Sequence, residues 1–289
     1  MAEAPTDCAV LSESAGVVPR PLAGLVVTGA DAPSYLHGQL SADVEALVPG
    51  DSVETLILTP QGRVIAVGTL VAGVEASGGD GFELIVDAGV AHDTRAALER
   101  FLIRVDVEIA QSERAWHHVA GPRAAEAADG ADAAVAYPGP LGGLLATGPI
   151  DAPEVSAEAF AARRVEAGEA LVGIDIGEKT IPHEAGLVPR AVSLDKGCYT
   201  GQELIERIHT RGHPNRALRA VRIGAADVPV PGSEVISGGK AVGVLTTTAV
   251  SCIWGQPAGL GLIRREIESG TEVEVSGSPG VVYEVPVEG

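Results

Sequence analysis

Hydrophobic and polar positions along the chain switch between the period of a strand and the period of a helix. The run LVVTG at residues 25–29 predicts a short strand. From Asp31, a good N-cap residue, apolar positions at helical spacing predict a helix that continues to about Leu47. A strand followed by a helix is therefore expected near the start of the fold.

Three β-rich runs follow, VETLIL, RVIAVGTLVAG and FELIVDA, and the segments PQG and SGGDG separate them. They predict antiparallel strands joined by tight connections. Residues 90–103 then predict a helix, and the alternation of Val105, Val107 and Ile109 predicts a half-buried strand. Strands and helices mix without regular βαβ order, which is typical of an α+β fold.

The second half of the chain divides into three regions of different composition and periodicity. Residues 120–143 are rich in Ala, Gly and Pro, and we expect a surface connection there. A helix is predicted over 156–167, with Ser156 as its cap and Glu158 and Glu166 on its polar side. Beyond Arg216, short β-rich runs punctuated by glycine predict a small β-barrel, with a hairpin turn at Gly238 and Gly239.

Acidic residues outnumber basic ones by 39 to 20, so the formal charge is -19. A charge of this sign repels nucleic-acid phosphates and anionic lipid surfaces, and neither is expected as a partner. Between Lys196 and Arg222, however, six basic side chains stand against two acidic ones. This local surplus fits either a salt-bridged helix and strand facing an acidic neighbour or an anion-binding surface.

The chain has three cysteines, Cys8, Cys198 and Cys252, widely spaced and without a CxxC pair. This pattern predicts neither a disulfide framework nor a zinc site, and it favours a reducing compartment. Cys8 and Cys252 are interpreted as small buried hydrophobes. The start of the chain lacks a basic, apolar leader, and no run approaches the roughly 18 apolar residues of a membrane span, so a cytoplasmic protein is predicted.

The most informative segment is DKGCYTGQELIERIHTRG, residues 195–212. A helix beginning near Gly201 places its positive end close to Cys198, and Lys196 adds a cation, so both effects favour the thiolate. Gln202 and Glu203 add polar groups in the first helical turn. We therefore favour an exposed, tuned thiol over a buried one, although no His and Asp partner for a papain-like nucleophile is evident.

A second segment, TIPHEAGL at residues 180–187, carries Glu184 between apolar neighbours. A carboxylate accepts two adjacent N–H donors, such as those on the amino-pyrimidinone edge of a pterin, although a solvated loop residue is the simpler interpretation of Glu184 alone. His209 and His213 lie four residues apart, but Gly212 and Pro214 end the helix there, so no metal site is predicted.

The string KGCYTGQE, residues 196–203, resembles the signature of YgfZ-type folate-binding proteins, which are relatives of the glycine cleavage T protein. GADAPSYLHGQLSADV, LTPQGRV and IPHEAGLVPRAVSLDKGCYTGQE resemble further blocks of that family. With the terminal barrel, the resemblance covers nearly the whole chain.

The resemblance implies an α+β cloverleaf of antiparallel subdomains around a central channel, with a C-terminal β-barrel. It divides the chain into a folate-binding region at 1–215, built from 1–50 with 140–215 and from 51–139, and a barrel at 216–289. It also implies tetrahydrofolate as the ligand and a role in iron-sulfur cluster assembly or repair, with iron-sulfur client or assembly proteins as partners. The residues carried over are Cys198 and Lys196 for catalysis, and Glu184, Tyr199, Gln202, Glu203 and Arg216 for folate.

One departure separates the chain from the T protein. Where that enzyme carries paired aspartates after the hairpin glycine, residues 63–67 read RVIAV, so Ala66 and Val67 replace the catalytic carboxylate. Without this group the chain lacks the element that handles the folate amine proton, and aminomethyltransferase activity is not expected. A folate-dependent aminomethyltransferase and an interaction module without folate remain the alternative hypotheses.

Overall fold

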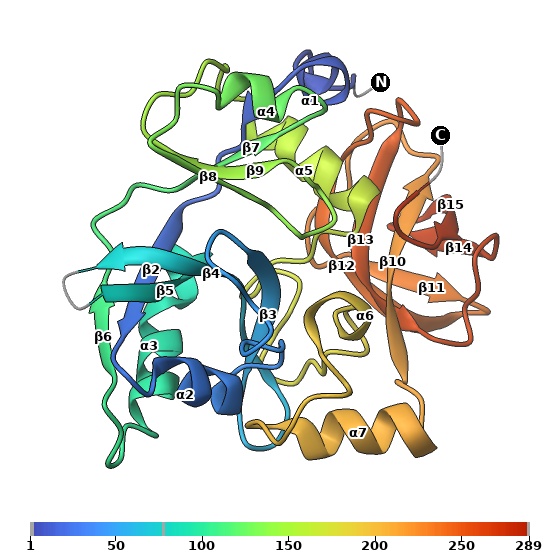
Figure 1. Cartoon of the computed structure of the whole chain (residues 1–289). Coiled ribbons are helices and arrows are strands. Elements are labelled where there is room, and N and C mark those ends of the chain that lie inside the picture. Colours follow the sequence, from blue (N-terminus) through green and yellow to red (C-terminus); the bar gives the residue numbers. More distant parts are fainter. Residues whose placement is uncertain (1–2, 77–78, 288–289) are drawn as a thin grey trace.

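The computed structural model describes residues 3–76 and 79–287, and its strands form two open sheets and one closed barrel (Figure 1). The five-stranded sheet is antiparallel and has the order β3-β4-β5-β2-β6. Its strands are β2 (Leu22–Thr28), β3 (Ser52–Leu58), β4 (Val64–Ala76), β5 (Gly79–Asp87) and β6 (Glu108–Gln111). The three predicted β-rich runs are therefore confirmed, while part of the connection predicted at SGGDG, residues 77–78, lies outside the described residues.

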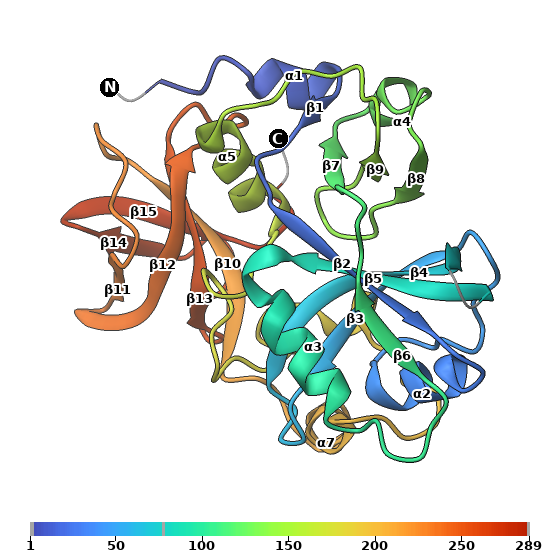
Figure 2. The same ribbon diagram turned by 90° about the vertical axis from the view of Figure 1, so that its left-hand side faces the viewer.

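Two helices cover one face of this sheet, α2 (Ala32–Gln39) and α3 (Ala91–Glu99), the second preceded by the short η1 (Ala88–Val90) (Figure 2). Leu36 and Leu98 bring these helices into one buried cluster with the sheet. The helix predicted to reach Leu47 stops at Gln39, because Leu40 is extended and forms a β-bridge with Ile57.

The four-stranded sheet has the order β1-β7-β9-β8. Its strands are β1 (Gly16–Val17), β7 (His117–Ala120), β8 (Ala133–Ala136) and β9 (Leu144–Thr147), with α1 (Cys8–Glu13) and α4 (Ala124–Ala127) packed nearby. The surface connection predicted over 120–143 is wrong in part, since it contains α4 and β8. Its alanines, among them Ala124 and Ala127, are small enough to pack closely in a buried cluster.

The last quarter of the described chain is a closed six-stranded barrel, which confirms the predicted C-terminal β-barrel. Its strands are β10 (Arg216–Ile223), β11 (Glu234–Ser237), β12 (Lys240–Val250), β13 (Pro257–Arg264), β14 (Glu272–Val275) and β15 (Ser278–Tyr283). Gly238 and Gly239 join β11 to β12 as predicted, both with positive φ, which a tight hairpin turn of this length requires.

Three helices lie in the remaining segment: α5 (Ala157–Ala167), α6 (Val188–Ala191) and α7 (Gln202–Arg211). Ser156 caps α5 as predicted, accepting a hydrogen bond from Ala159 N at 3.2 Å. Glu166, predicted on the polar side of α5, is instead buried. Because α5 packs against the barrel, Glu166 Oε1 accepts hydrogen bonds from Ser251 Oγ and Ile253 N.

The sheets group the strands differently from the division carried over from the resemblance. Strand β2 belongs to the predicted unit 1–50 with 140–215, yet it pairs with β5 and β6 of the predicted unit 51–139. Strands β7 and β8, predicted within 51–139, pair with β9 instead. Pairing over long sequence distances decides this grouping, and local sequence pattern carries no information about it.

Cys8 and Cys252 form a disulfide, with Cα atoms 5.6 Å apart and 244 residues of separation. The interpretation of these two cysteines as unpaired hydrophobes is therefore wrong. The bridge ties α1 to the turn between β12 and β13. In residues 3–76 and 79–287, none of the helices combines the length and the apolar character needed to cross a bilayer.

Candidate functional site

The hairpin between β3 and β4 packs directly on the start of α7. Gly201, which precedes α7, has a φ of 86°, and a Cβ there would lie 2.7 Å from Thr59 O. At Gly62 a Cβ would lie 2.7 Å from the Cβ of Leu204. Two glycines are thus needed for the PQG turn and the KGCYTGQE segment to touch, so the two motifs form one structural unit.

Lys196 caps the C-terminal end of helix α2, although it belongs to a distant part of the chain. Its Nζ donates to the carbonyl oxygens of His37, Leu40 and Ala42 at 2.5, 2.8 and 2.7 Å. Partial burial lowers the pKa of Lys196 to about 8. All three N–H groups of the ammonium therefore neutralise the C-terminal end of α2, and none is left to donate to the thiol of Cys198.

Most of the polar residues after Cys198 form hydrogen bonds that stabilise the conformation of the KGCYTGQE segment. The Gln202 side chain accepts a hydrogen bond from Tyr199 N at 2.8 Å. Thr200 donates to the Gln39 side chain at 3.1 Å. The Tyr199 ring is buried, its hydroxyl has no hydrogen-bond partner in the described chain, and burial raises its pKa to about 12. Glu203 is exposed.

Cys198 is exposed and is not bonded to another cysteine of the described chain. Residues 3–76 and 79–287 contain no group of three or more His, Cys, Asp or Glu side chains arranged as metal ligands. The described residues that line the two pockets on either side of residues 173–180 include Thr200 but not Cys198. The structure thus places this thiol on the surface beside the grooves rather than inside one.

Glu184 and Arg216, both predicted as folate contacts, meet in a two-point ion pair. Arg216 Nε lies 3.0 Å from Glu184 Oε1, and Arg216 Nη2 lies 3.1 Å from Oε2. The Glu184 side chain is 8% exposed and the Arg216 side chain 41% exposed. The solvated-loop interpretation of Glu184 is therefore wrong: its carboxylate is buried, and its backbone carbonyl accepts a hydrogen bond from Leu218 N of β10.

Two open pockets, of about 740 and 540 Å³, share Gly177 and Glu178 of the loop at 173–180. The larger lies between the β3–β4 hairpin, α3 and this loop. The smaller lies between the loop and the barrel, and Arg216 lines it together with Ile174, Val244 and Leu262. Arg63 Nη1 donates to Lys179 O at 2.6 Å, which anchors the loop to the hairpin. We call the two pockets on either side of this loop the groove. Its walls are partly apolar and partly polar, as in sites that small ligands occupy.

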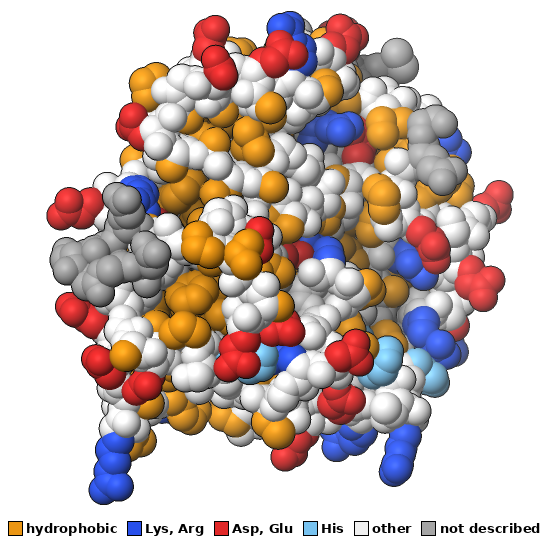
Figure 3. Space-filling view, viewed as in Figure 1, with side chains coloured by type: hydrophobic (Ala, Val, Ile, Leu, Met, Phe, Trp, Pro, Cys, Tyr) orange, Lys and Arg blue, Asp and Glu red, His pale blue; other side chains and the backbone are white. Residues whose placement is uncertain are grey.

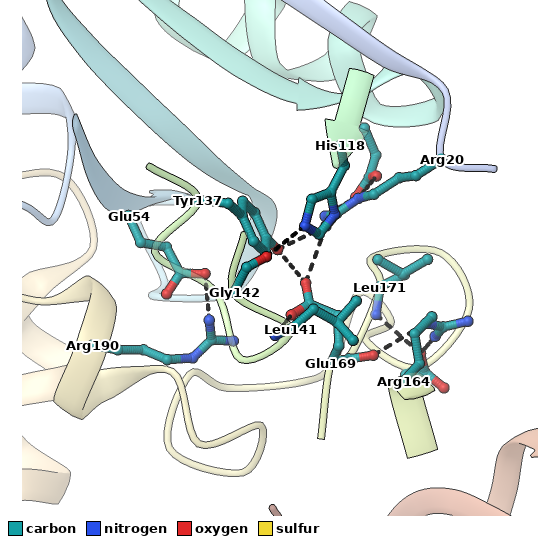
Figure 4. Close-up of polar contacts among 12 residues, drawn as sticks. Arg20, Glu54, His118, Tyr137, Leu141, Gly142, Arg164, Glu169, Leu171 and Arg190 are labelled. Atoms are coloured by element: carbon teal, nitrogen blue, oxygen red, sulfur yellow. Dashed lines mark hydrogen bonds and ion pairs between the residues drawn. The ribbon is translucent and has the colours of Figure 1, made fainter. Parts of the chain in front are cut away.

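A buried polar cluster at the centre of the molecule escaped the sequence analysis (Figure 4). Arg20 pairs with Asp87 at 2.6 Å and with Glu169 at 3.1 Å, and it donates to Tyr137 Oη at 2.7 Å. Glu54 pairs with Arg190 of α6. We call this cluster the buried hub; its titratable members are Arg20, Glu54, Asp87, His118, Tyr137, Arg164, Glu169, Asp175 and Arg190.

The hub connects both sheets to the barrel. Arg164 pairs with Asp175, whose other oxygen accepts hydrogen bonds from Thr246 and Thr247 of β12. His118 of β7 packs its ring on Tyr137, with centroids 4.2 Å apart, and burial lowers the pKa of His118 to about 4. Sequence spacing could not reveal this cluster, because its members come from elements spread between Arg20 and Thr247.

Glu54 occupies a special place in the hub. Leu56 pairs with Val67, and Glu54 pairs with Thr69, so Glu54 projects from the same face of the sheet as Val67. Burial raises the pKa of Glu54 to about 6, and Oε2 has no hydrogen-bond partner among the described residues. Both residues line a cavity of about 10 Å³, space for about one water molecule.

The basic segment from Lys196 to Arg222 is partly neutralised. Arg219 pairs with Glu284 at 3.3 Å, Arg216 pairs with Glu184, and Arg222 stacks on the Tyr283 ring. Arg207 and Arg211 of α7 are exposed. In Figure 3, basic and histidine side chains gather at the lower right, over the end of α7 and the foot of the barrel. The salt-bridge interpretation is therefore confirmed for Arg216 and Arg219, and an anion-binding surface stays a prediction for the exposed Arg207 and Arg211.

No family model matches the chain. An aminomethyltransferase from Rubrobacter xylanophilus is 28% identical over an alignment of 298 residues, which covers 90% of this chain and 78% of the relative. Proteins named tRNA-modifying protein YgfZ from Escherichia coli O157:H7 and Photorhabdus laumondii are 27% and 26% identical over 239 and 242 residues, covering 72% and 73% of this chain and 72% of each relative.

The crystal structure of the glycine cleavage system aminomethyltransferase T from Bartonella henselae superposes with a TM-score of 0.83 and 21% sequence identity. The superposition covers 97% of this chain and 88% of that one. The predicted fold is therefore confirmed: the chain has the mixed, largely antiparallel architecture of the glycine cleavage T protein with a closed C-terminal barrel, and its homologues include YgfZ proteins and an aminomethyltransferase.

Proposed function

We propose that this chain binds tetrahydrofolate and acts as an accessory protein in iron-sulfur cluster assembly or repair. The observation that carries the folate half of the proposal is Glu184, a buried carboxylate whose two oxygens face a two-donor partner, Arg216, which lines an open pocket. The amino-pyrimidinone edge of a pterin presents the same pair of adjacent N–H donors. Arg216 supplies a cation for the anionic glutamate tail.

Two residues of strand β4, Ala66 and Val67, argue against one-carbon transfer as the main activity. Ala66 packs in the core of the five-stranded sheet, and Val67 packs against the cluster that contains Leu187 and Tyr199. Neither side chain exchanges a proton. The chain therefore lacks a carboxylate at the place where the T protein carries its catalytic aspartate, and we propose a binding role.

We propose that Cys198 takes part in the transient transfer of an iron-sulfur cluster to or from a partner protein that contacts the surface. Its exposed position beside the groove suits contact with an iron-sulfur client. Stable cluster ligation normally takes about four protein ligands, so a single thiol suits transient transfer. A Cys198→Ser variant should fail to restore a strain that lacks the chain's cluster-related function, and full restoration by this variant would refute the role.

Folate binding is tested by anaerobic calorimetric titration of tetrahydrofolate into wild type, Glu184→Ala and a Glu158→Ala control. Glu158 is exposed on α5 and lines neither pocket. We expect binding by wild type and control, and a loss of at least about tenfold in affinity for Glu184→Ala, because a two-point charged contact is removed. No binding by wild type would leave an interaction module without folate as the better description.

A second candidate is a folate-dependent aminomethyltransferase, favoured by one observation. Glu54 is a carboxylate on the same sheet face as Val67, and both line one small cavity. An assay with a lipoamide-bound aminomethyl donor should show no methylene-tetrahydrofolate if the first proposal holds. Turnover by wild type that Glu54→Gln abolishes would instead establish the transferase and assign its carboxylate.

Partners and location belong to the same proposal. Two relatives carry tRNA modification in their names, but the net charge of -19 disfavours direct contact of this chain with RNA. We propose iron-sulfur client or assembly proteins as its partners, in a cytoplasmic setting. The disulfide between Cys8 and Cys252 gives that setting a direct test, because a reducing compartment would keep the bridge open.

A further inference from the structure

The Glu184 carboxylate is already occupied by a group from its own chain. The guanidinium of Arg216 approaches both carboxylate oxygens, at 3.0 and 3.1 Å. A guanidinium and an amino-pyrimidinone edge present the same hydrogen-bond pattern, two parallel N–H donors in one plane. Arg216 therefore fills the position that the edge of a pterin would take on Glu184.

The two partners differ in their freedom to move. Glu184 is held by the chain around it: its side chain is 8% exposed, its backbone carbonyl accepts from Leu218 N at 2.8 Å, and its Oε2 also accepts from Ile181 N at 3.4 Å. Arg216 is 41% exposed and lines the open pocket of about 540 Å³. A ligand that reaches Glu184 must displace Arg216, and the arginine has solvent-filled space to enter.

The pocket gives a displaced Arg216 few anionic partners of its own. Asp175, which also lines it, is engaged by Arg164, Thr246 and Thr247, and Lys179 adds a second cation. Glu178 is the remaining acidic side chain in the lining. A ligand that carries its own carboxylates would supply the partner that the displaced guanidinium loses.

We propose that Arg216 is a displaceable internal ligand of Glu184 and sets the specificity of the groove for molecules that join a pterin-like edge to an anionic tail. The inference rests on the proposed function and deepens it. A pterin without a tail must break the Glu184–Arg216 pair without replacement. A folate with a glutamate tail exchanges one ion pair for another. The groove therefore selects its ligands by the charge of their tail as well as by their ring.

The test uses two probes, a tail-free tetrahydropterin and tetrahydrofolate triglutamate, against wild type, Arg216→Gln and an Arg219→Gln control. Arg219 lies on the same strand and pairs with the exposed Glu284. In Arg216→Gln we expect the tail-free ring to bind about tenfold more tightly, because its site is no longer occupied. The triglutamate should bind about tenfold more weakly, because a charged contact is lost.

Arg216→Lys keeps the charge without the planar fork and separates the two effects. It should retain most of the triglutamate affinity and still bind the tail-free ring more tightly than wild type does. Parallel weakening of both probes in Arg216→Gln and Arg216→Lys would overturn the inference, because Arg216 would then be an ordinary contact for the whole ligand.

A probe unrelated to folate keeps the inference separable from the proposed function. Methylguanidinium ion should raise the midpoint of thermal unfolding of Arg216→Ala, by refilling the position on Glu184, and should leave wild type unchanged. No stabilisation of Arg216→Ala would count against a displaceable site. Rescue by methylguanidinium with no folate binding by wild type would uphold the exchangeable pair and refute the proposed ligand.

Discussion

Glu54 and Glu184 are both buried carboxylates that pair with an arginine, yet their second oxygens differ. Glu184 has both oxygens in contact with Arg216, whereas Glu54 Oε2 has no partner in the chain as described. The hub around Glu54 contains four carboxylates and three arginines among the described side chains (Glu54, Asp87, Glu169, Asp175; Arg20, Arg164, Arg190). One proton on Glu54 would balance that charge.

Glu54→Gln should therefore change the pH dependence of stability. Burial raises the pKa of Glu54 from 4.5 to about 6, with Arg190, Glu169 and Arg20 as the charges that face it. The folded state thus binds the proton more tightly, and this stabilisation is present below about pH 4.5 and lost as the pH rises through about 6. Relative to wild type, Glu54→Gln should gain about 2 kcal/mol in unfolding free energy across that interval.

Chemical denaturation at several pH values measures this difference. Glu83→Gln is the matched control, because Glu83 is also buried in the five-stranded sheet and both its oxygens have partners, Trp116 and Arg114. Its difference from wild type measures the cost of neutralising a buried carboxylate whose two oxygens are both paired. A difference between Glu54→Gln and wild type that does not change with pH would show that Glu54 does not take up the proton.

At the scale of elements, the KGCYTGQE segment joins α2, the β3–β4 hairpin and α7. Lys196 closes the end of α2, Thr200 contacts Gln39, and Gly201 lies against the hairpin. The segment therefore has a structural task whatever Cys198 does. Two variants separate this task from chemistry at the thiol.

Lys196→Met should destabilise α2 rather than alter the thiol. Removing three hydrogen bonds from a charged donor to carbonyl oxygens should lower the unfolding free energy by about 2 kcal/mol. Hydrogen exchange should accelerate over residues 32–42, while the alkylation rate of Cys198 stays as in wild type. A slower alkylation with unchanged exchange would instead place the lysine charge at the thiol. Lys240→Met, at the exposed barrel hairpin, is the control.

Gly201→Ala should cost about 2 kcal/mol, since the residue has positive φ and a Cβ would meet Thr59 O at 2.7 Å. Gly232→Ala provides a matched control, because Gly232 has a φ of 94° and no atom within 4 Å of its Cβ position. The excess loss of Gly201→Ala over this control measures the contact between hairpin and helix. Equal losses would mean that the contact adds nothing beyond backbone strain.

For the whole molecule, the bridge between Cys8 and Cys252 connects the N-terminal helix to the barrel. It ties α1, which packs on α5, to a turn of the barrel. Closing a loop of 244 residues restricts the unfolded chain strongly, and such bridges typically contribute about 2–4 kcal/mol. The contribution disappears in a compartment that keeps thiols reduced.

Reductant should therefore lower the midpoint of thermal unfolding of wild type, and Cys8→Ser should show the lower midpoint with or without reductant. Cys198→Ser should respond to reductant as wild type does. Thiol labelling followed by mass measurement should count one reactive cysteine before reduction and three after it. Three labels on protein isolated directly from its cells would support the predicted reducing, cytoplasmic setting.

Local sequence pattern determined the elements whose signals lie within a few residues. The β-rich runs of the five-stranded sheet, the Ser156 cap, the Gly238–Gly239 turn and the helix after Gly201 needed only spacing and turn chemistry. The motif KGCYTGQE, matched to a known family, pointed to the fold that the comparison with the T protein confirmed.

Only the tertiary structure decided which distant residues meet. The pairing of β2 with β5, the Cys8–Cys252 bridge and the buried hub all join residues separated by long stretches of chain, and no periodicity encodes such contacts. It also assigned Lys196 to the end of α2 and Arg216 to Glu184, because a long charged side chain reaches partners that its sequence neighbours do not reveal. Sequence thus set the type of each element, and long-range packing and charge pairing set what the polar side chains do.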